Sequence, residues 1–171
     1  MMNKKGFTLI EILAVILILS LITTGSIAVV IRSKKVANDK LAVKLEDSLT
    51  AVGKSIYVHE FLSGNKEDDN YFYKKYKNLG DNESLYISLT ELGKKNYLTD
   101  LKKENSNYKF KSPYGSDKTC DGYLMITKVK DAPEYKGYIS CEGGYKSKDY
   151  DKNKPNDSDY VQITETIRFK N

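Results

Sequence analysis

An almost wholly apolar run, from Phe7 to Ile31, constrains the fold of this chain more than any other feature. As a helix it would be about 37 Å long, more than the thickness of the hydrocarbon core of a bilayer. Lys4 and Lys5 lie just before the run, so the positive-inside rule places the N-terminus in the cytoplasm and the chain after Ile31 outside. The sequence therefore predicts a single-pass membrane segment followed by an external domain.

One carboxylate, Glu11, lies inside this run, and three interpretations of the segment differ in how they treat it. A cleaved secretory signal peptide would use the small-x-small site Ser26-Ile27-Ala28, but a disposable signal gains nothing from a costly charge. A plain membrane anchor would place Glu11 near the cytoplasmic edge, where it complements the positive end of the helix dipole. The third interpretation comes from the residues around the carboxylate.

The string "KKGFTLIE" at residues 4–11 resembles the class III leader of type IV prepilins and pseudopilins. The shared features are basic residues, a Gly, a Phe, and a Glu as the fifth residue of the mature chain. The resemblance implies a leader peptide of residues 1–6, cleavage by prepilin peptidase between Gly6 and Phe7, and methylation of the new amino group on Phe7. It also implies that residues 7–31 form the membrane-embedded and later the filament-core half of the N-terminal helix.

The resemblance supplies a role for Glu11 in assembly. After cleavage, Phe7 would carry an α-amino group with a reference pKa of about 8, which is largely cationic at neutral pH. In a helical filament of pilins, the Glu of one subunit meets the N-terminal amine of its neighbour. Because an unpaired charge in an apolar core is costly, this pair would set the register between subunits.

The helical pattern continues through residues 32–62 with an amphipathic character. Its apolar side chains recur at steps of three and four, on one face of a helix: Leu41, Leu45, Leu49, Val52 and Ile56. No Pro interrupts the segment, and Ser63-Gly64 is a plausible stop. We therefore expect one long helix up to about Leu62.

Residues 63–171 form the expected globular head. Residues 64–87 are interpreted as a polar connecting region with some local structure, and a short helix is expected after it, because Ser88 and Glu91 have capping-box spacing. Strands are predicted by apolar alternation at residues 122–129, 137–143 and 159–169, with a further edge strand at 107–112. The predicted fold class is α+β, a pilin fold in which the amphipathic half of the helix packs on an antiparallel sheet.

Cysteine content and charge bear on the environment and the partners of the head. Outside the cytoplasm, Cys120 and Cys141 are expected to form a disulfide. The chain carries a net charge of +5, but its lysines alternate with acidic residues, as in "KSKDYDKNK". Such a pattern is typical of a solvated mixed surface, so nucleic acid is not expected as the primary partner.

No catalytic constellation is evident in the sequence, so the chain is not expected to be an enzyme. The only His, His59, is too far in sequence from the cysteines to suggest a zinc site, and no cofactor is expected. One weak calcium candidate exists in "DYDKNKPNDSD", where Asp and Asn oxygens alternate as in a calcium-binding loop, but the Gly and Glu of an EF-type loop are missing. Its candidate ligands are Asp149, Asp151, Asn153 and Asp157.

Taken with the resemblance, these patterns favour a structural subunit of a type IV pilus. Such a subunit waits in the cytoplasmic membrane with its head outside, and a pilus assembly platform polymerises it into an extracellular helical homopolymer. Fibres of this kind serve motility, adhesion, surface colonisation or biofilm formation. The alternatives are a pseudopilin of a type II secretion or competence system, a minor tip pilin, and, in a different class, a membrane-anchored extracellular binding domain.

Overall fold

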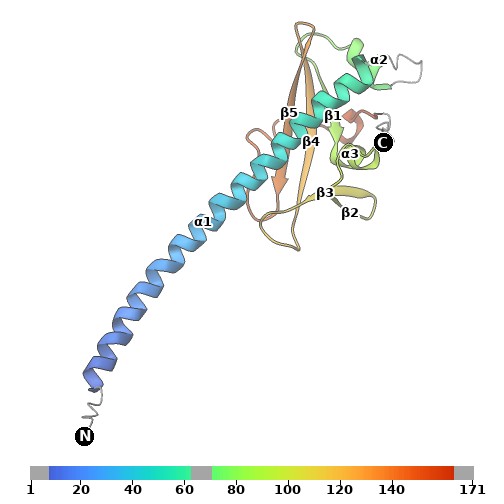
Figure 1. Ribbon diagram of the computed structural model, residues 1–171. Coiled ribbons are helices and arrows are strands. Elements are labelled where there is room, and N and C mark those ends of the chain that lie inside the picture. The colour runs from blue at the N-terminus through green and yellow to red at the C-terminus, as the bar shows by residue number, and fades with distance from the viewer. Residues whose placement is uncertain (1–7, 63–70, 164–171) are drawn as a thin grey trace, which may run out of the picture. The chain divides into compact units, whose positions relative to one another are not determined.

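The computed structural model describes residues 8–62 and 71–163 (Figure 1). The chain divides into two compact units, residues 1–38 and residues 39–171, and helix α1 (Leu9–Tyr57) contributes to both. Among the described residues, no helix is both long enough and apolar enough to cross a membrane.

Helix α1 is followed directly by a π-helical turn, η1 (Val58–Leu62). The helical residues predicted up to Leu62 are therefore confirmed, with the difference that the last five adopt the wider π geometry. Side chains explain the length of α1, because Pro is absent and Leu, Ile, Ala and Lys, which favour helices or tolerate them, dominate its sequence. Residues 63–70, where the stop was predicted, lie outside the described part of the chain.

The head contains a five-stranded antiparallel sheet built around the long strand β4 (Thr119–Val129). Strand β5 (Ala132–Cys141) pairs with one edge of β4 from Cys120↔Cys141 to Val129↔Ala132. The other edge of β4 is shared by β1 (Ser84–Ser88) and β3 (Asn107–Lys111), and β2 (Leu101–Glu104) pairs with β3. The strands predicted at residues 122–129 and 137–143 are thus confirmed as parts of β4 and β5, which pair with each other.

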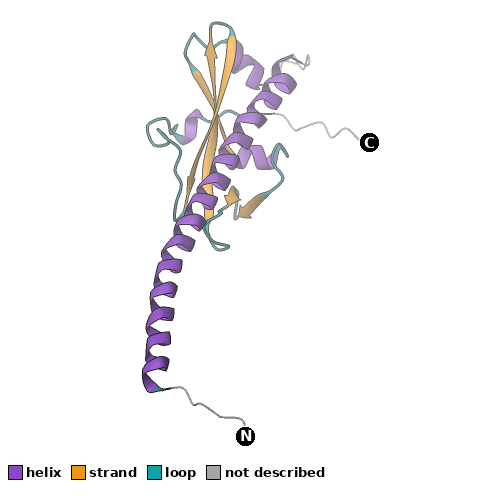
Figure 2. Cartoon of the chain, turned by 60° about the vertical axis from the view of Figure 1, so that its left-hand side comes forward, coloured by secondary structure: helices purple, strands orange, loops and turns teal. Residues whose placement is uncertain are grey.

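Alternation along β4 gives the sheet two different faces. Leu124 and Ile126 belong to the main core, which also contains Leu49 and Ile56 of α1, all fully buried. Tyr123 belongs to a second cluster with other tyrosines of the head. Figures 1 and 2 show the second half of α1 lying along the sheet, so the α+β prediction, a long helix packed on an antiparallel sheet, is confirmed.

The approach of α1 to β5 requires a glycine. A Cβ atom at Gly137 would lie 2.5 Å from the Glu46 carbonyl oxygen of α1. No side chain fits at that distance, and the Gly137 N–H donates to Thr50 Oγ1 on the helix at 3.0 Å. The backbone contact at Gly137 and its hydrogen bond to Thr50 together set the distance between α1 and the edge strand β5.

Residues 64–87 contain more structure than the connecting region that was expected. Helix α2 (Tyr71–Lys77) and all but the last residue of strand β1 fall inside it, and both supply core residues, among them Phe72, Tyr76, Leu85 and Ile87. The expected short helix is confirmed as α3 (Leu89–Lys94), with Ser88 Oγ accepting the N–H of Glu91. The Glu91 side chain, however, binds elsewhere, so only half of the capping box forms.

Two strand predictions need correction. The strand predicted at residues 107–112 is present as β3, but it lies between β4 and β2 and is not an edge strand. The strand predicted at residues 159–169 is wrong over residues 159–163, which make only an isolated bridge, Tyr86↔Tyr160, after the short 3-10 turn η2 (Asp157–Asp159). Residues 164–169 lie outside the described residues.

Candidate functional site

The first described turn of α1 places Glu11 in a local cap. Its Oε2 atom accepts the Thr8 backbone N–H at 2.8 Å and the Thr8 hydroxyl at 3.0 Å. Glu11 therefore occupies the third position of the helix and satisfies one of the backbone donors that every helix start leaves open. Gly6 and Phe7, the residues of the predicted cleavage site, lie outside the described residues.

Apolar side chains after this cap are exposed in the isolated chain. Leu9 is 84% exposed and Leu21 is 73% exposed, and the residues between them include a nearly unbroken series of exposed Ile, Leu and Val. The series resumes at Val29, Val30 and Ile31. So large a contiguous apolar surface marks a region that functions with a partner or in an apolar solvent.

The head attaches to α1 through carboxylates that hydrogen-bond to tyrosine and serine hydroxyls. Tyr145 Oη and Ser147 Oγ each donate to Glu46 Oε2 at 2.7 Å, and Tyr114 Oη donates to Asp39 Oδ1. Burial, with the bond to Glu46 as a second cause, raises the pKa of Tyr145 to about 12. These bonds fix the loops after β3 and β5 to the helix.

The bonds from Glu46 and Asp39 to the head were not predicted from the sequence. Glu46 and Asp39 lie on a polar face of the amphipathic helix, which is typical of solvent-exposed residues. Their partners follow about 75 to 100 residues later. The only signal was the number of tyrosines, 14 in the whole chain, all of them after residue 38.

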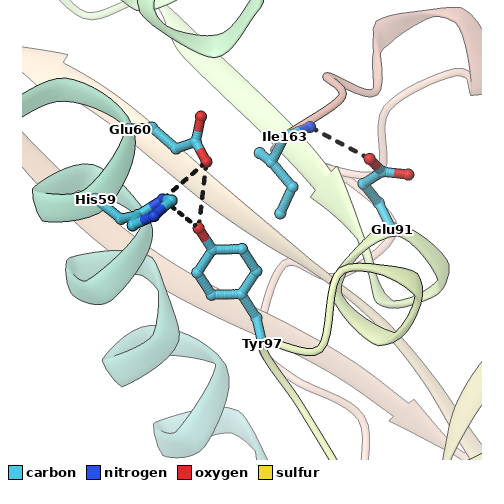
Figure 3. A network of polar contacts seen from close by, with 5 residues as sticks. All are labelled: His59, Glu60, Glu91, Tyr97 and Ile163. Carbon is cyan, nitrogen blue, oxygen red and sulfur yellow. Dashed lines mark hydrogen bonds and ion pairs between the residues drawn. The ribbon is translucent and has the colours of Figure 1, made fainter. Parts of the chain in front are cut away.

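A second polar group ties the end of the long helix to the segment after α3 (Figure 3). The Tyr97 hydroxyl lies 3.0 Å from His59 Nδ1 and 3.2 Å from Glu60 Oε1, and Glu60 is fully buried. Burial first, and then the charge of Glu60, raises the pKa of the Tyr97 phenol. His59 therefore takes part in a structural contact between the end of the helical segment and the head.

The predicted disulfide joins Cys120 of β4 to Cys141 of β5, with both residues buried. Cys120 also pairs in register with Phe110 of β3. The bond therefore lies where three strands meet, and it closes a loop with a sequence separation of 21 residues. Constraint of that loop in the unfolded chain stabilises the head by about 3 kcal/mol.

The weak calcium candidates do not form a recognisable cation site. Asp151 pairs with Lys146, and the Asn153 side-chain amide donates to Tyr138 Oη at 3.0 Å and to the Asp149 carbonyl at 3.1 Å. Within residues 8–62 and 71–163, no three His, Cys, Asp or Glu residues come together as metal ligands would. The calcium site stays a prediction without geometric support, and nothing is said of Asp157, whose side chain is not described.

Comparison with protein families gives one finding, a match of residues 1–27 to the prokaryotic N-terminal methylation motif. No curated protein and no solved structure matches the chain. The matched motif is the class III signal, and it implies an inner-membrane precursor, processing by prepilin peptidase and outward assembly into a filament.

The matched segment and the head complement each other, because the motif continues into α1 and α1 packs on the antiparallel sheet. Neither feature alone defines the protein, since a methylation motif describes only processing and an α+β head only a fold. The two features occur together in a family of structural proteins that have no catalytic role. An N-terminal methylation motif followed by a long helix that packs on an antiparallel sheet is the combination found in the type IV pilin/pseudopilin superfamily.

Proposed function

We propose that this chain is a body subunit of an extracellular type IV pilus. In this proposal residues 1–6 are removed between Gly6 and Phe7, Phe7 is N-methylated, and an assembly platform extracts the subunit into a helical fibre. Residues 7–31 then form the fibre core, while residues 32–62 carry the head of residues 63–171. The observation that supports it best is the exposed apolar surface of α1 directly after the methylation motif.

The energetic argument rests on burial of that surface. Transferring a Leu or Ile side chain from water to an apolar environment is favourable by about 1.5–3 kcal/mol. The exposed residues between Leu9 and Ile31 can be covered by lipid before assembly and by equivalent helices of neighbouring subunits afterwards. The same surface therefore serves as a temporary anchor and as a polymer interface.

Glu11 would change partners during this process. In the uncleaved chain its carboxylate accepts bonds from Thr8, within its own helix. Cleavage at Gly6 creates a cationic amine on Phe7, and in the fibre the amine of a neighbouring subunit would compete with Thr8 for the same carboxylate. Since a buried ion pair is favourable only with good geometry, this exchange would specify register more than overall stability.

Mass spectrometry of the membrane-extracted protein and of fibres sheared from cells tests the proposal. We expect a chain that begins with methylated Phe7 in both fractions, with the sheared fraction abundant. An intact Met1, or a start at Val29 after the alternative signal-peptide site, would contradict the pilin interpretation. Methylated Phe7 in membranes but not in sheared fibres would instead favour a pseudopilin or a minor subunit.

A further inference from the structure

The apolar stripe of the amphipathic helix is covered unevenly within the head. Leu49 and Ile56 are fully buried, whereas Leu41, on the same face, is 49% exposed. Leu41 and Leu45 line an open groove of about 620 Å³, whose other apolar walls are Leu98, Phe110 and Pro113. The sheet thus leaves one part of the stripe uncovered, and this volume is in the range of typical binding pockets.

The groove also contains charged residues. Lys44 from α1, Lys111 from β3 and Asp100 from the segment before β2 belong to its lining. An occupant that matches the groove would therefore present apolar side chains to its floor, and both an acidic and a basic residue to its rim.

The last described residues of the chain bind α3, and the segment that follows α3, residues 97–100, lines the groove. The Ile163 N–H donates to Glu91 Oε1 of α3 at 3.2 Å, and Ile163 is buried. Figure 3 shows Ile163 next to Glu91 in the same close-up as Tyr97, and Tyr97 is part of the groove lining. The eight residues after Ile163 could extend about 26 Å at 3.3 Å per residue, which is enough to pass along the groove.

The sequence of those eight residues, TETIRFKN, has the composition that the groove requires. Val161 and Ile163 alternate and are both buried, and Ile167 and Phe169 continue the same alternation. Glu165 could meet Lys44 or Lys111, and Arg168 or Lys170 could meet Asp100. Apolar residues and charges of both signs are thus available at suitable positions.

We propose that residues 164–171 of the same chain occupy this groove, with Ile167 and Phe169 packed on Leu41, Leu45 and Phe110. The segment covers the part of the helical stripe that the sheet leaves open. It also completes the surface of the head at the start of residues 39–171, beside the loop held by Tyr114 and Asp39.

Photocrosslinking of the full-length chain in detergent tests this inference. A p-benzoylphenylalanine in place of Leu41 should form adducts with residues 164–171, detected by mass spectrometry of digested protein. The matched control is the same residue in place of Val43, which is also exposed but lies about 200° around the helix from Leu41 and should give no such adduct. Mixing isotope-labelled and unlabelled chains separates adducts within one chain from adducts between chains.

Two substitutions add a second readout. Phe169→Asp should lower the adduct yield at position 41 about tenfold, because an ionised carboxylate is disfavoured against the apolar floor of the groove. Thr166→Asp, which also adds a carboxylate but lies on the opposite side of the alternation from Ile167 and Phe169, should leave the yield nearly unchanged. Equal tail adducts from positions 41 and 43, no tail adduct at position 41, or adducts only between differently labelled chains would each overturn the proposal.

Discussion

At residues 9–21 and 29–31, helix α1 exposes its apolar side chains, whereas from Ala42 to Ile56 it buries most of its apolar stripe against the sheet of the head. The two segments have similar helical backbones and differ in the distribution of side chains. The first is apolar on all sides, so it has no polar face to leave in water. The second is amphipathic, and the sheet covers most of its stripe and leaves Leu41 half-exposed.

The difference shows how one helix can belong to two environments. Residues 39–57 owe their position to contacts within the chain, namely apolar packing, the approach at Gly137 and the bonds from Glu46 and Asp39. Residues 9–31 belong to the other compact unit, and their large apolar side chains that the structure describes are exposed, so their stability depends on what surrounds them. Substitutions in the two segments should therefore affect different measurements.

The largest effect is expected from Glu11→Ala. In the proposed fibre this substitution leaves the Phe7 amine of the neighbouring subunit without its partner inside an apolar core. We expect processing and membrane insertion to continue while the amount of subunit in sheared fibres falls at least tenfold, as measured by immunoblotting. Glu104→Ala, at an exposed carboxylate of the head, is the control and should leave fibre incorporation intact.

Wild-type levels of the Glu11→Ala subunit in fibres would show that the carboxylate only caps its own helix. That outcome agrees with the bonds from Thr8 in the uncleaved chain. It would leave the family assignment untouched, because the methylation motif does not depend on the charge pair.

The two segments can also be compared by the loss of unfolding free energy that Leu49→Ala and Leu17→Ala cause. Leu49 is fully buried between α1 and the sheet, so its truncation should lower the free energy of unfolding of the head by about 2–5 kcal/mol. Leu17 is exposed, and the same truncation there should change that free energy by less than about 0.5 kcal/mol. Urea unfolding in detergent measures both, and equal losses would show that the two segments are not independent.

Alkaline pH should act on the tyrosines, all of which lie at or after Tyr57. Burial raises the pKa of Tyr114, Tyr135 and Tyr145 to about 12, above the unfolded value of about 10. The folded state therefore favours neutral phenols, so stability is retained below pH 10 and declines as the pH rises from about 10 to about 12. Tyrosine absorbance and urea unfolding as functions of pH report this decline.

Tyr145→Phe tests the contribution of one bond to that alkaline decline. At neutral pH the variant loses the bond to Glu46, at a cost of about 1 kcal/mol. Above pH 10 it should lose less additional stability than the wild type, since one ionisable phenol is gone. A decline as steep as that of the wild type would assign the alkaline transition to the other tyrosines.

Sequence patterns predicted the parts of the molecule that depend on local periodicity. The long helix follows from apolar spacing, and the β4–β5 hairpin follows from two adjacent apolar strands with a short connection. Cys120 and Cys141 could be paired because the chain has only two cysteines and is predicted to lie outside the cytoplasm. Processing and assembly residues came from the resemblance of "KKGFTLIE" and not from geometry.

The parts that were missed depend on partners distant in sequence. Strand β2 has the sequence LKKE, which contains no apolar alternation and becomes a strand only by pairing with β3. Residues 159–163 have strand-like alternation, yet after Tyr160 the Ile163 N–H binds the Glu91 side chain instead of a neighbouring strand. Glu46 looked like a surface residue, because Tyr145 and Ser147 reach it only in the folded head.

The smallest effects are expected from substitutions at two helix starts, each of which has a Ser or Thr three residues before a Glu. In α3, Ser88 Oγ accepts the Glu91 N–H, and Ser88→Ala should lower the free energy of unfolding of the head by about 1 kcal/mol. In α1 the cap runs the other way, from the Thr8 N–H and hydroxyl to Glu11, and Thr8→Ala retains the backbone donor. Thr8→Ala should therefore leave head unfolding unchanged in urea titrations. A loss at Thr8 as large as the loss at Ser88 would mean that the start of α1 contributes to the folding of residues 39–171, and the separation of the two segments would have to be abandoned.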